Sequence, residues 1–166
     1  MPVHNLKQEF PMTPAIRMLK AAKAEYTPML YVFEERGGTS HLARELGVDE
    51  HLTVKTLIME TDAKKPLIIL MHGDCSVSLK ELARTIGVKS VKPCEPAQAD
   101  RNSGYHVGGT TPFATRRQMP VYVERSILEL DKIYINGGYR GFVLEMSPQV
   151  VVDLLNPIPV NVALPS

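Results

Sequence analysis

A glycine pair lies within a strand-like apolar run in each of two segments, Val107-Gly108-Gly109-Thr110-Thr111-Pro112 and Ile135-Asn136-Gly137-Gly138-Tyr139-Arg140-Gly141. Because glycine has no Cβ, such a pair lets backbone amides come close to a ligand. Glycine pairs also occur in β-bulges and tight turns, and the second segment fits a hairpin turn between Tyr134 and Phe142 equally well. The first segment has neither the GK[ST] nor the GxGxxG pattern of a nucleotide-binding loop. The two segments therefore predict either simple turns or two walls of one small pocket.

A lone cation lies in a third apolar segment, Val54-Lys55-Thr56-Leu57. In a strand, Lys55 shares a face with Leu57, and because both faces are apolar we expect the strand to be covered on both sides. An unpaired buried ammonium is costly, so the lysine must reach a cleft or a partner, unless it snorkels from a sheet edge. With the glycine pairs it predicts a pocket with exposed amides and one positive charge. Such a pocket suits an ester carbonyl, a carboxylate or a phosphate.

The composition is that of one ordinary globular domain, with 166 residues, a charged fraction of 22% and a net charge of +1. This charge argues against binding nucleic acid through bulk electrostatics, although Arg101, Arg116 and Arg117 flank the first glycine pair as a local basic patch or as ordinary surface charges. We find no apolar stretch of roughly 18 residues and no basic-then-apolar leader, so we expect a cytoplasmic protein without membrane or DNA partners. Cys75 and Cys94 show no CxxC spacing and are expected to be free thiols.

Cap residues and apolar periodicity predict four helices, over about 14–24, from Thr39 or Ser40 to Gly47, from Ser78 to Gly87, and from Pro148 to Leu155. Strands are expected near 29–33, 52–60, 67–71, 89–93, 104–108, 120–124, 132–136 and 142–146. Clustered strands favour an α+β fold with a mixed or partly closed sheet over a doubly wound fold. We expect residues 1–12 to be a loose arm, residues 13–156 to form the domain, and residues 157–166 to be an irregular, proline-rich tail.

Other kinds of active site find little support in the sequence. There is no GxSxG motif, and no carboxylates are paired for acid–base work. A zinc site could be assembled from His72, Cys75, Cys94 and His106, but only the first two have ligand-like spacing, so we expect no metal and no cofactor. His41 and His51 are expected at the surface, and Cys75 as an inert thiol. A pocket without an obvious base can still accelerate attack on an activated ester by holding it and donating amide hydrogen bonds.

Four segments, over 13–15, 54–57, 103–112 and 133–141, occur in an order and spacing that resembles the YbaK/EbsC family. This is the family of trans-acting aminoacyl-tRNA editing domains, related to the insertion domain of bacterial prolyl-tRNA synthetase. The resemblance covers roughly residues 13–156. It implies a compact α+β fold with a mixed, barrel-like β-sheet flanked by helices. It also implies hydrolysis, in trans, of the ester in mischarged tRNA, of the Cys-tRNA(Pro) type or with another small amino acid.

Carried over by position, the resemblance implies that Lys55 holds the 3′-terminal nucleotide or the substrate, and that the backbone of Gly108 orients the reactive group. The substrate-binding positions that it implies are Thr56, Gly109, Thr110, Thr111, Asn136, Gly137 and Gly138. The expected partner is aminoacyl-tRNA, with an aminoacyl-tRNA synthetase as an open expectation. Members that clear cysteine are thought to use the substrate's own thiol, and others an oriented water.

The sequence departs from the cysteine-clearing members at several places. Asn136 stands where they often carry serine, and Val143 where they have an aspartate that can meet the substrate's amino group. His106 replaces an aliphatic residue, and the segment 34–40 is shorter and lacks the aromatic that closes their pocket. We predict an aminoacyl-tRNA deacylase, with a non-catalytic module that binds a tRNA end or aminoacyl nucleotide as the alternative. Pocket differences discriminate by only about 1–3 kcal/mol per methylene, so the amino acid stays open.

Overall fold

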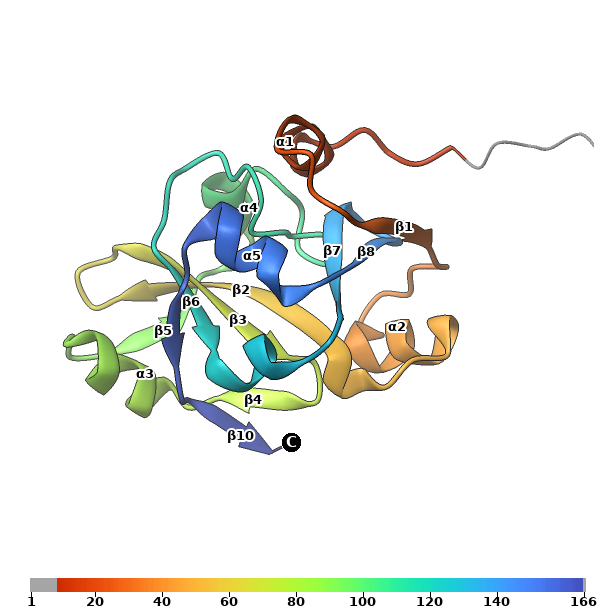
Figure 1. Ribbon diagram of the computed structural model, residues 1–166. Coiled ribbons are helices and arrows are strands. Elements are labelled where there is room, and N and C mark those ends of the chain that lie inside the picture. The colour runs from red at the N-terminus through yellow and green to blue at the C-terminus, as the bar shows by residue number, and fades with distance from the viewer. Residues whose placement is uncertain (1–8, 166) are drawn as a thin grey trace, which may run out of the picture.

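The computed structural model describes residues 9–165, which form a mixed α+β domain (Figure 1). The helices are α1 Pro14–Ala21, α2 Gly38–Leu46, α3 Leu79–Ile86, α4 Pro96–Ser103 and α5 Pro148–Leu155, with the short 3-10 helices η1 Glu50–Leu52 and η2 Arg125–Glu129. The strands are β1 Thr27–Leu30, β2 Thr53–Thr61, β3 Pro66–His72, β4 Cys75–Val77, β5 Val91–Pro93, β6 Val121–Glu124, β7 Ile133–Tyr139, β8 Phe142–Met146, β9 Ile158–Val160 and β10 Ala163–Pro165. The predicted α+β class is confirmed. None of the described helices is long and apolar enough to cross a membrane.

Side-chain caps fix the starts of three helices where the sequence predicts them. Thr13, Ser78 and Ser147 each accept a hydrogen bond from a backbone N–H in the first turn of α1, α3 and α5. α3 ends at Gly87 in the left-handed conformation, which glycine adopts without strain. α2 differs slightly from the prediction, because it begins at Gly38 and has no side-chain cap.

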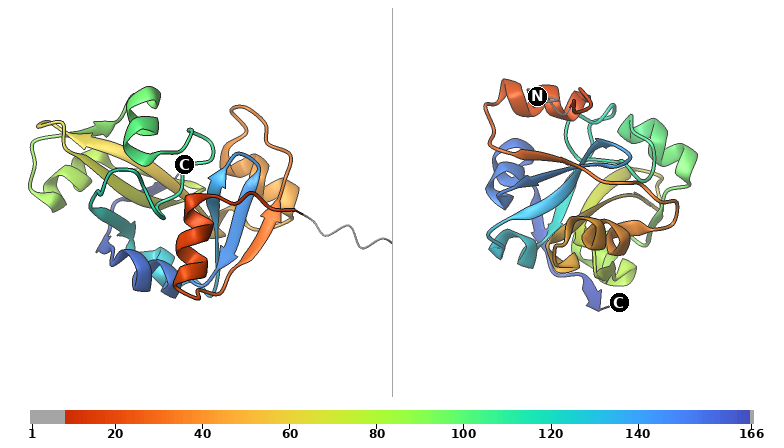
Figure 2. Two further views of the ribbon diagram at one scale, coloured as in Figure 1. Left: turned by 90° about the horizontal axis from the view of Figure 1, so that it is seen from above. Right: turned by 90° about the vertical axis from the view of Figure 1, so that its right-hand side faces the viewer.

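Eight strands form one mixed sheet in the order β1-β8-β7-β2-β3-β6-β9, and β5 pairs with the far end of β2. The pairs β2–β7, β3–β6 and β6–β9 are parallel, and the others are antiparallel. Figure 2 shows the β7–β8 hairpin running at a steep angle to the β2–β3 hairpin. Within residues 9–165 no pairing joins the edge strands β1 and β9, so the expected barrel-like closure is not confirmed.

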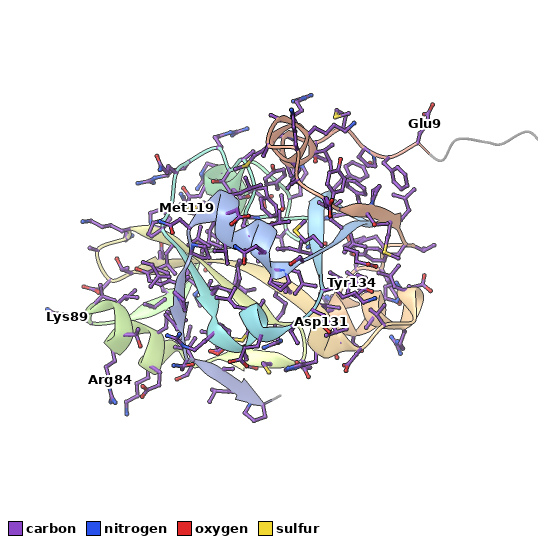
Figure 3. The ribbon with its side chains drawn as sticks, viewed as in Figure 1. Glu9, Arg84, Lys89, Met119, Asp131 and Tyr134 are labelled. Atoms are coloured by element: carbon purple, nitrogen blue, oxygen red, sulfur yellow. The ribbon has the colours of Figure 1, made fainter. Side chains whose placement is uncertain are left out.

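The strand β2 contributes to a separate apolar cluster on each of its faces. Val54 and Ile58 pack into the larger cluster, which includes side chains of α1 and α5. Leu57 and Met59 pack on the other face, with Leu82 of α3. Side chains fill the space between the sheet and the helices on both sides (Figure 3). The prediction that this strand is covered on both faces is confirmed.

One predicted strand is wrong. Residues 104–108 form bends and turns, because α4, which the sequence analysis did not predict, occupies the preceding residues and ends at Gly104 in the left-handed conformation. The predicted N-terminal arm lies largely outside the described residues. Of its described part, Phe10 stacks on Phe142 with ring centroids 6.0 Å apart, so the arm reaches the core just before α1.

The prediction of an irregular C-terminal tail is also wrong. β9 extends the main sheet by parallel pairing with β6, and β10 pairs antiparallel with β4. The physical reason is the alternation of apolar residues between the prolines. Val160 and Val162 are both only 2% exposed and join the apolar cluster on the Leu57 face of β2. The free energy gained by burying these side chains outweighs the loss of the N–H groups that the prolines lack.

Candidate active site

A cavity of ≈ 630 Å³ opens between the middle of β2, the start of α2, α4 and the two glycine segments. Its volume lies within the range of about 300–1,000 Å³ that is typical of small-molecule sites. Five of the residues predicted for the site line it, namely Lys55, Thr56, Gly108, Thr110 and Asn136. These residues come from three segments far apart in the sequence, and the sheet brings them together.

The centre of the cavity is a fork where β7 separates from β2. β7 pairs only with Thr53 and Val54 of β2, and β5 joins the same side of β2 from Met59 onward. Main-chain hydrogen bonds of Thr53 and Thr61 point toward the β3 side. Because successive residues of a strand point their N–H and C=O groups to opposite sides, Thr56 directs both groups into the open fork.

Two side-chain atoms at the fork are buried without a hydrogen-bond partner in the described part of the chain. They are Oγ1 of Thr56 and Oδ1 of Asn136. An unsatisfied buried polar group costs about 1–3 kcal/mol, so a ligand that pairs with these atoms gains that free energy. Both residues line the cavity, which makes the fork a polar recognition point in an otherwise largely apolar wall.

The neighbour of Asn136 across the β7–β8 ladder is Val143. Val143 is fully buried against Leu42 of α2 and against Tyr134, which lies beside α2 in Figure 3. The position where the resemblance implies an aspartate therefore carries no charge and does not line the cavity. Polar contact from this side of the fork comes from Asn136.

Lys55 extends from the opposite face of β2 and donates a hydrogen bond from Nζ to the backbone oxygen of Cys75 in β4. Burial lowers the pKa of Lys55 below its usual value, and this effect is partly offset by Cys75, Glu50 and Asp74. A carbonyl is a neutral acceptor, so the lysine keeps a net positive charge for a ligand. The lysine thus has both the cleft and the partner that the sequence predicts.

Gly108 brings backbone into the cavity wall in a conformation that side chains rarely adopt, with φ of +99°. A Cβ at this position would lie 3.0 Å from the ring of Phe33. The Arg140 guanidinium lies 5.2 Å from the centre of that ring, and its Nε donates to the Val107 oxygen at 2.9 Å. Within residues 9–165 the N–H of Gly108 has no acceptor.

The other four predicted substrate-binding residues, Gly109, Thr111, Gly137 and Gly138, do not line the cavity. The second glycine pair forms a bulge in β7, and the hairpin turn falls at Arg140 and Gly141 instead. The Thr13 hydroxyl donates to the Gly137 oxygen at 2.6 Å, and a Cβ on Gly138 would lie 2.7 Å from the Tyr105 ring. This pair therefore serves the packing of α1 and Tyr105 against the sheet.

Gly109 joins the two glycine segments to each other. A Cβ on Gly109 would lie 2.8 Å from the backbone nitrogen of Arg140 and 2.8 Å from the carbonyl carbon of Tyr139. These are backbone atoms, which cannot turn away as a side chain can. Glycine is needed here for contact between the loops, and that contact positions the neighbouring Gly108.

Two cavity-lining features were missed from the sequence. The segment 34–40 carries no aromatic, but Tyr31 and Phe33, directly before it, both line the cavity. His41 also lines it, with a side chain only 13% exposed, so its predicted surface position is wrong. Its Nδ1 lies 3.0 Å from Glu34 and its Nε2 2.6 Å from the Val32 oxygen, so it ties this segment to α2. The alternation of aromatics in the predicted strand over 29–33 was the available signal.

The turn between β3 and β4 is held rigidly beside Lys55. The N–H of Gly73 donates to the Thr53 oxygen at 2.8 Å, and a Cβ on Gly73 would lie only 2.0 Å from the Thr53 hydroxyl. His51 Nδ1 donates to Asp74 at 2.9 Å. Burial by itself raises the pKa of Asp74, but the hydrogen bond and charge of His51 outweigh it, so this pKa is lowered. The turn presents the Cys75 carbonyl in a fixed position.

Among the described residues, His51, His72 and Asp74 form the one group of at least three such side chains close enough to share a metal ion. The two imidazole rings are stacked, with centroids 3.8 Å apart and an angle of 8°. Lone pairs in parallel ring planes do not converge on one ion, and His72 already bonds the His51 oxygen and the Ser126 hydroxyl. The group is a hydrogen-bond network, and Cys94 and His106 are not part of it.

The three arginines of the predicted basic patch meet at the C-terminal end of α4. The backbone N–H groups of Arg116 and Arg117 donate to the oxygens of Ser103 and Asn102, close to Arg101. All three side chains are exposed and lie outside the cavity wall.

Comparison with known proteins identifies the chain's relatives. The profile of the aminoacyl-tRNA editing domain matches residues 34–154. EbsC of Enterococcus faecalis, named as a candidate Cys-tRNA(Pro)/Cys-tRNA(Cys) deacylase, is 26% identical over 145 residues, which cover 87% of this chain and 88% of EbsC. A proline–tRNA ligase of Thermodesulfovibrio yellowstonii is 31% identical over 91 residues, which cover 55% of this chain and 14% of the ligase.

The fold has solved counterparts as well. A structure described as a candidate trans-editing enzyme for prolyl-tRNA synthetase superimposes with a TM-score of 0.77 and 16% identity, covering 92% of this chain and 98% of that one. The match to the family profile covers both glycine segments, the lysine strand and all the cavity-lining residues except Tyr31 and Phe33. The chain therefore belongs to the family of aminoacyl-tRNA editing domains.

Proposed function

We propose that this protein is an aminoacyl-tRNA deacylase that hydrolyses, in trans, the ester between a small amino acid and the 3′ end of mischarged tRNA. The observation that carries the proposal is the fork between β2 and β7, where the buried Thr56 Oγ1 and Asn136 Oδ1 have no partner among the described residues. An aminoacyl ester supplies both hydrogen-bond donors and acceptors for such a fork.

In this proposal the α-ammonium of the amino acid donates to Asn136 Oδ1 and to the Thr56 hydroxyl or carbonyl. The N–H of Gly108 donates to the ester carbonyl, where negative charge develops as the tetrahedral intermediate forms. Lys55, held by the Cys75 carbonyl, stabilises negative charge on the ester or on the adjoining phosphate. The aromatic pair Tyr31 and Phe33 gives an apolar wall for the terminal base or the side chain.

The wall holds one imidazole, on His41, and both of its nitrogens are engaged. The proposed attack therefore depends on positioning. An oriented water hydrolyses the ester directly, whereas a substrate thiol would displace the tRNA 3′ oxygen, which leaves as a hydroxyl with the thiol proton, and water would then open the resulting thiolactone. In this proposal the amino group is met by the neutral acceptors of Thr56 and Asn136, since Val143 is buried and uncharged, while the carboxylates of Glu34 and Glu35 also line the cavity. For this reason we extend the proposal beyond cysteine to other small amino acids.

The experiment is single-turnover deacylation of Cys-, Ala-, Ser- and Thr-tRNA by the purified protein, against spontaneous hydrolysis without protein. The proposal expects release of at least one of these amino acids well above background, with the others slower. Equal, background-level release from every member of the panel would contradict it.

A second candidate function is a non-catalytic module that binds the tRNA end or an aminoacyl nucleotide. Val143 favours it, because position 143 of β8 carries no charged partner for the substrate's amino group. An amide-linked 3′-aminoacyl-adenosine, which cannot be hydrolysed, separates the two functions. Tight binding of this mimic without turnover of any ester substrate would support the binding module and exclude the deacylase.

A further inference from the structure

The hydrogen-bond acceptor of Lys55 belongs to a strand outside the main sheet. Within the described residues, β4 pairs with a single strand, β10, which places Ala163 opposite Val77 and Pro165 opposite Cys75. The N–H of Ser78, directly after β4, donates to the Val162 oxygen at 2.8 Å. In Figure 1 β10 lies along β4 at the lower edge of the molecule. The C-terminal strand thus supports the carbonyl that holds Lys55.

The C-terminal segment is itself fixed by a buried carboxylate. Glu124, at the end of β6, is 3% exposed and accepts hydrogen bonds from the N–H groups of Val162 at 2.6 Å and Ala163 at 3.2 Å. Parallel pairing of β9 with β6 places Val160 opposite Glu124. A buried carboxylate that satisfies two backbone N–H groups is a strong local anchor, and it holds the chain where β9 passes into β10.

This segment lies beyond residue 154, where the match to the editing-domain family ends. We propose that residues 158–165 are a functional part of the editing site, because they hold β4 so that the Cys75 carbonyl fixes Lys55 at the cavity, with Glu124 as the positioning residue. The proposal rests on the deacylase function proposed above. A lysine side chain carries about 2 kcal/mol of rotamer entropy, so a fixed acceptor matters for where its ammonium is found.

The most direct variant is a chain that ends at Val162. It removes β10, whose three side chains are all exposed, but its new terminal carboxylate at Val162 lies beside the buried Glu124, so rates are measured well below the Tm of the shortened chain. Because a shift of about 1 Å at a catalytic group can cost up to about 100-fold in rate, we expect kcat to fall at least about tenfold while KM changes less than about threefold. An unchanged kcat, or a higher KM at unchanged kcat, would overturn the proposal.

Substitutions at Glu124 test the anchor without shortening the chain. Glu124→Ala leaves the N–H groups of Val162 and Ala163 without their acceptor, and we expect the same loss of kcat. Glu124→Gln keeps one carbonyl acceptor and should restore most of the rate. Val151→Ala, in α5 and in the other apolar cluster, is the stability-matched control and should keep wild-type kcat at a temperature where it is folded.

A readout independent of turnover is the titration of Lys55, followed by NMR of lysine labelled at Cε and assigned with Lys55→Arg. Burial lowers the pKa of Lys55, so release from the Cys75 carbonyl into water should raise this pKa toward its usual value in the shortened chain. If wild-type protein deacylates no tRNA but this shift is seen, the deacylase function fails and the support of Lys55 stands. If wild-type protein is active and neither kcat nor the pKa changes, the inference about the C-terminal segment is wrong.

Discussion

Replacing Thr56 by valine should make the protein more stable and less active at the same time. The Thr56 hydroxyl is buried in the fork without a hydrogen-bond partner among residues 9–165. Valine has nearly the same shape and puts a methyl group where the hydroxyl was. The free protein then no longer buries an unsatisfied polar atom, whereas the proposed complex loses a contact to the α-ammonium.

The magnitudes follow from the two states of this hydroxyl. An unsatisfied buried polar group costs about 1–3 kcal/mol, so Thr56→Val should raise the free energy of unfolding by about 1 kcal/mol. For a chain of this size that is a rise in Tm of about 2–4 °C. A hydrogen bond to a charged group contributes about 1.5–3 kcal/mol, so kcat/KM should fall by at least about tenfold.

The assay pairs thermal unfolding with single-turnover deacylation, and the chain offers a matched control. The Thr111 hydroxyl is likewise buried without a partner but does not line the cavity, so Thr111→Val should gain stability and keep its rate. The reasoning is refuted if Thr56→Val gains stability with no loss of rate, because the hydroxyl then makes no contact with the substrate. A loss of stability would show that it has a partner in the free protein.

Three other predictions concern the loops, the lysine and the arginines. Gly109→Ala should lower the free energy of unfolding by about 1–3 kcal/mol, because its Cβ would lie 2.8 Å from backbone atoms of the second glycine segment. If urea unfolding gave the same free energy as for the wild-type protein, the two loops would not be in contact. The proposed role of Lys55 needs its protonated form, which is present below its pKa and lost above it. Because burial lowers the pKa of Lys55, the deacylation rate should fall at a lower pH than it would for a free lysine. A fall at the usual lysine value would argue against the buried position. Replacing both Arg116 and Arg117 by alanine should weaken binding of all tRNAs alike and reduce the salt dependence of binding. If the wild-type protein instead distinguished tRNAs strongly and the double variant did not, these arginines would recognise the tRNA body, contrary to this prediction.

Sequence reasoning succeeded where local chemistry decides the structure. Hydroxyl caps at Thr13, Ser78 and Ser147 and the glycine at the end of α3 depend on a few neighbouring residues, and all four are where the sequence placed them. Apolar alternation around Lys55 also identified a strand with two covered faces. The membership of the editing-domain family, read from motif order, is confirmed.

Tertiary contacts decide the features that the sequence did not predict. A Cβ on Gly137 would meet the Phe142 ring, and one on Gly138 would meet the Tyr105 ring and Thr13, which are distant along the chain. The tail looked irregular because it is rich in proline and because the strand that pairs with its last residues, β4, is distant along the chain, with Leu164 opposite Ser76. The assignment of individual residues to catalysis and substrate binding stays a prediction.

Our central proposal is that Lys55, in the cavity wall, is needed for removal of an amino acid from tRNA. The most direct measurement is the single-turnover rate of Lys55→Ala on the best substrate of the panel, with Tm and unfolding curves recorded for the same preparation. We expect a folded protein that has lost most of its turnover, because the ammonium that the Cys75 carbonyl holds at the cavity wall is gone while the apolar clusters are intact. A folded Lys55→Ala protein that deacylates at a near-normal rate would contradict it.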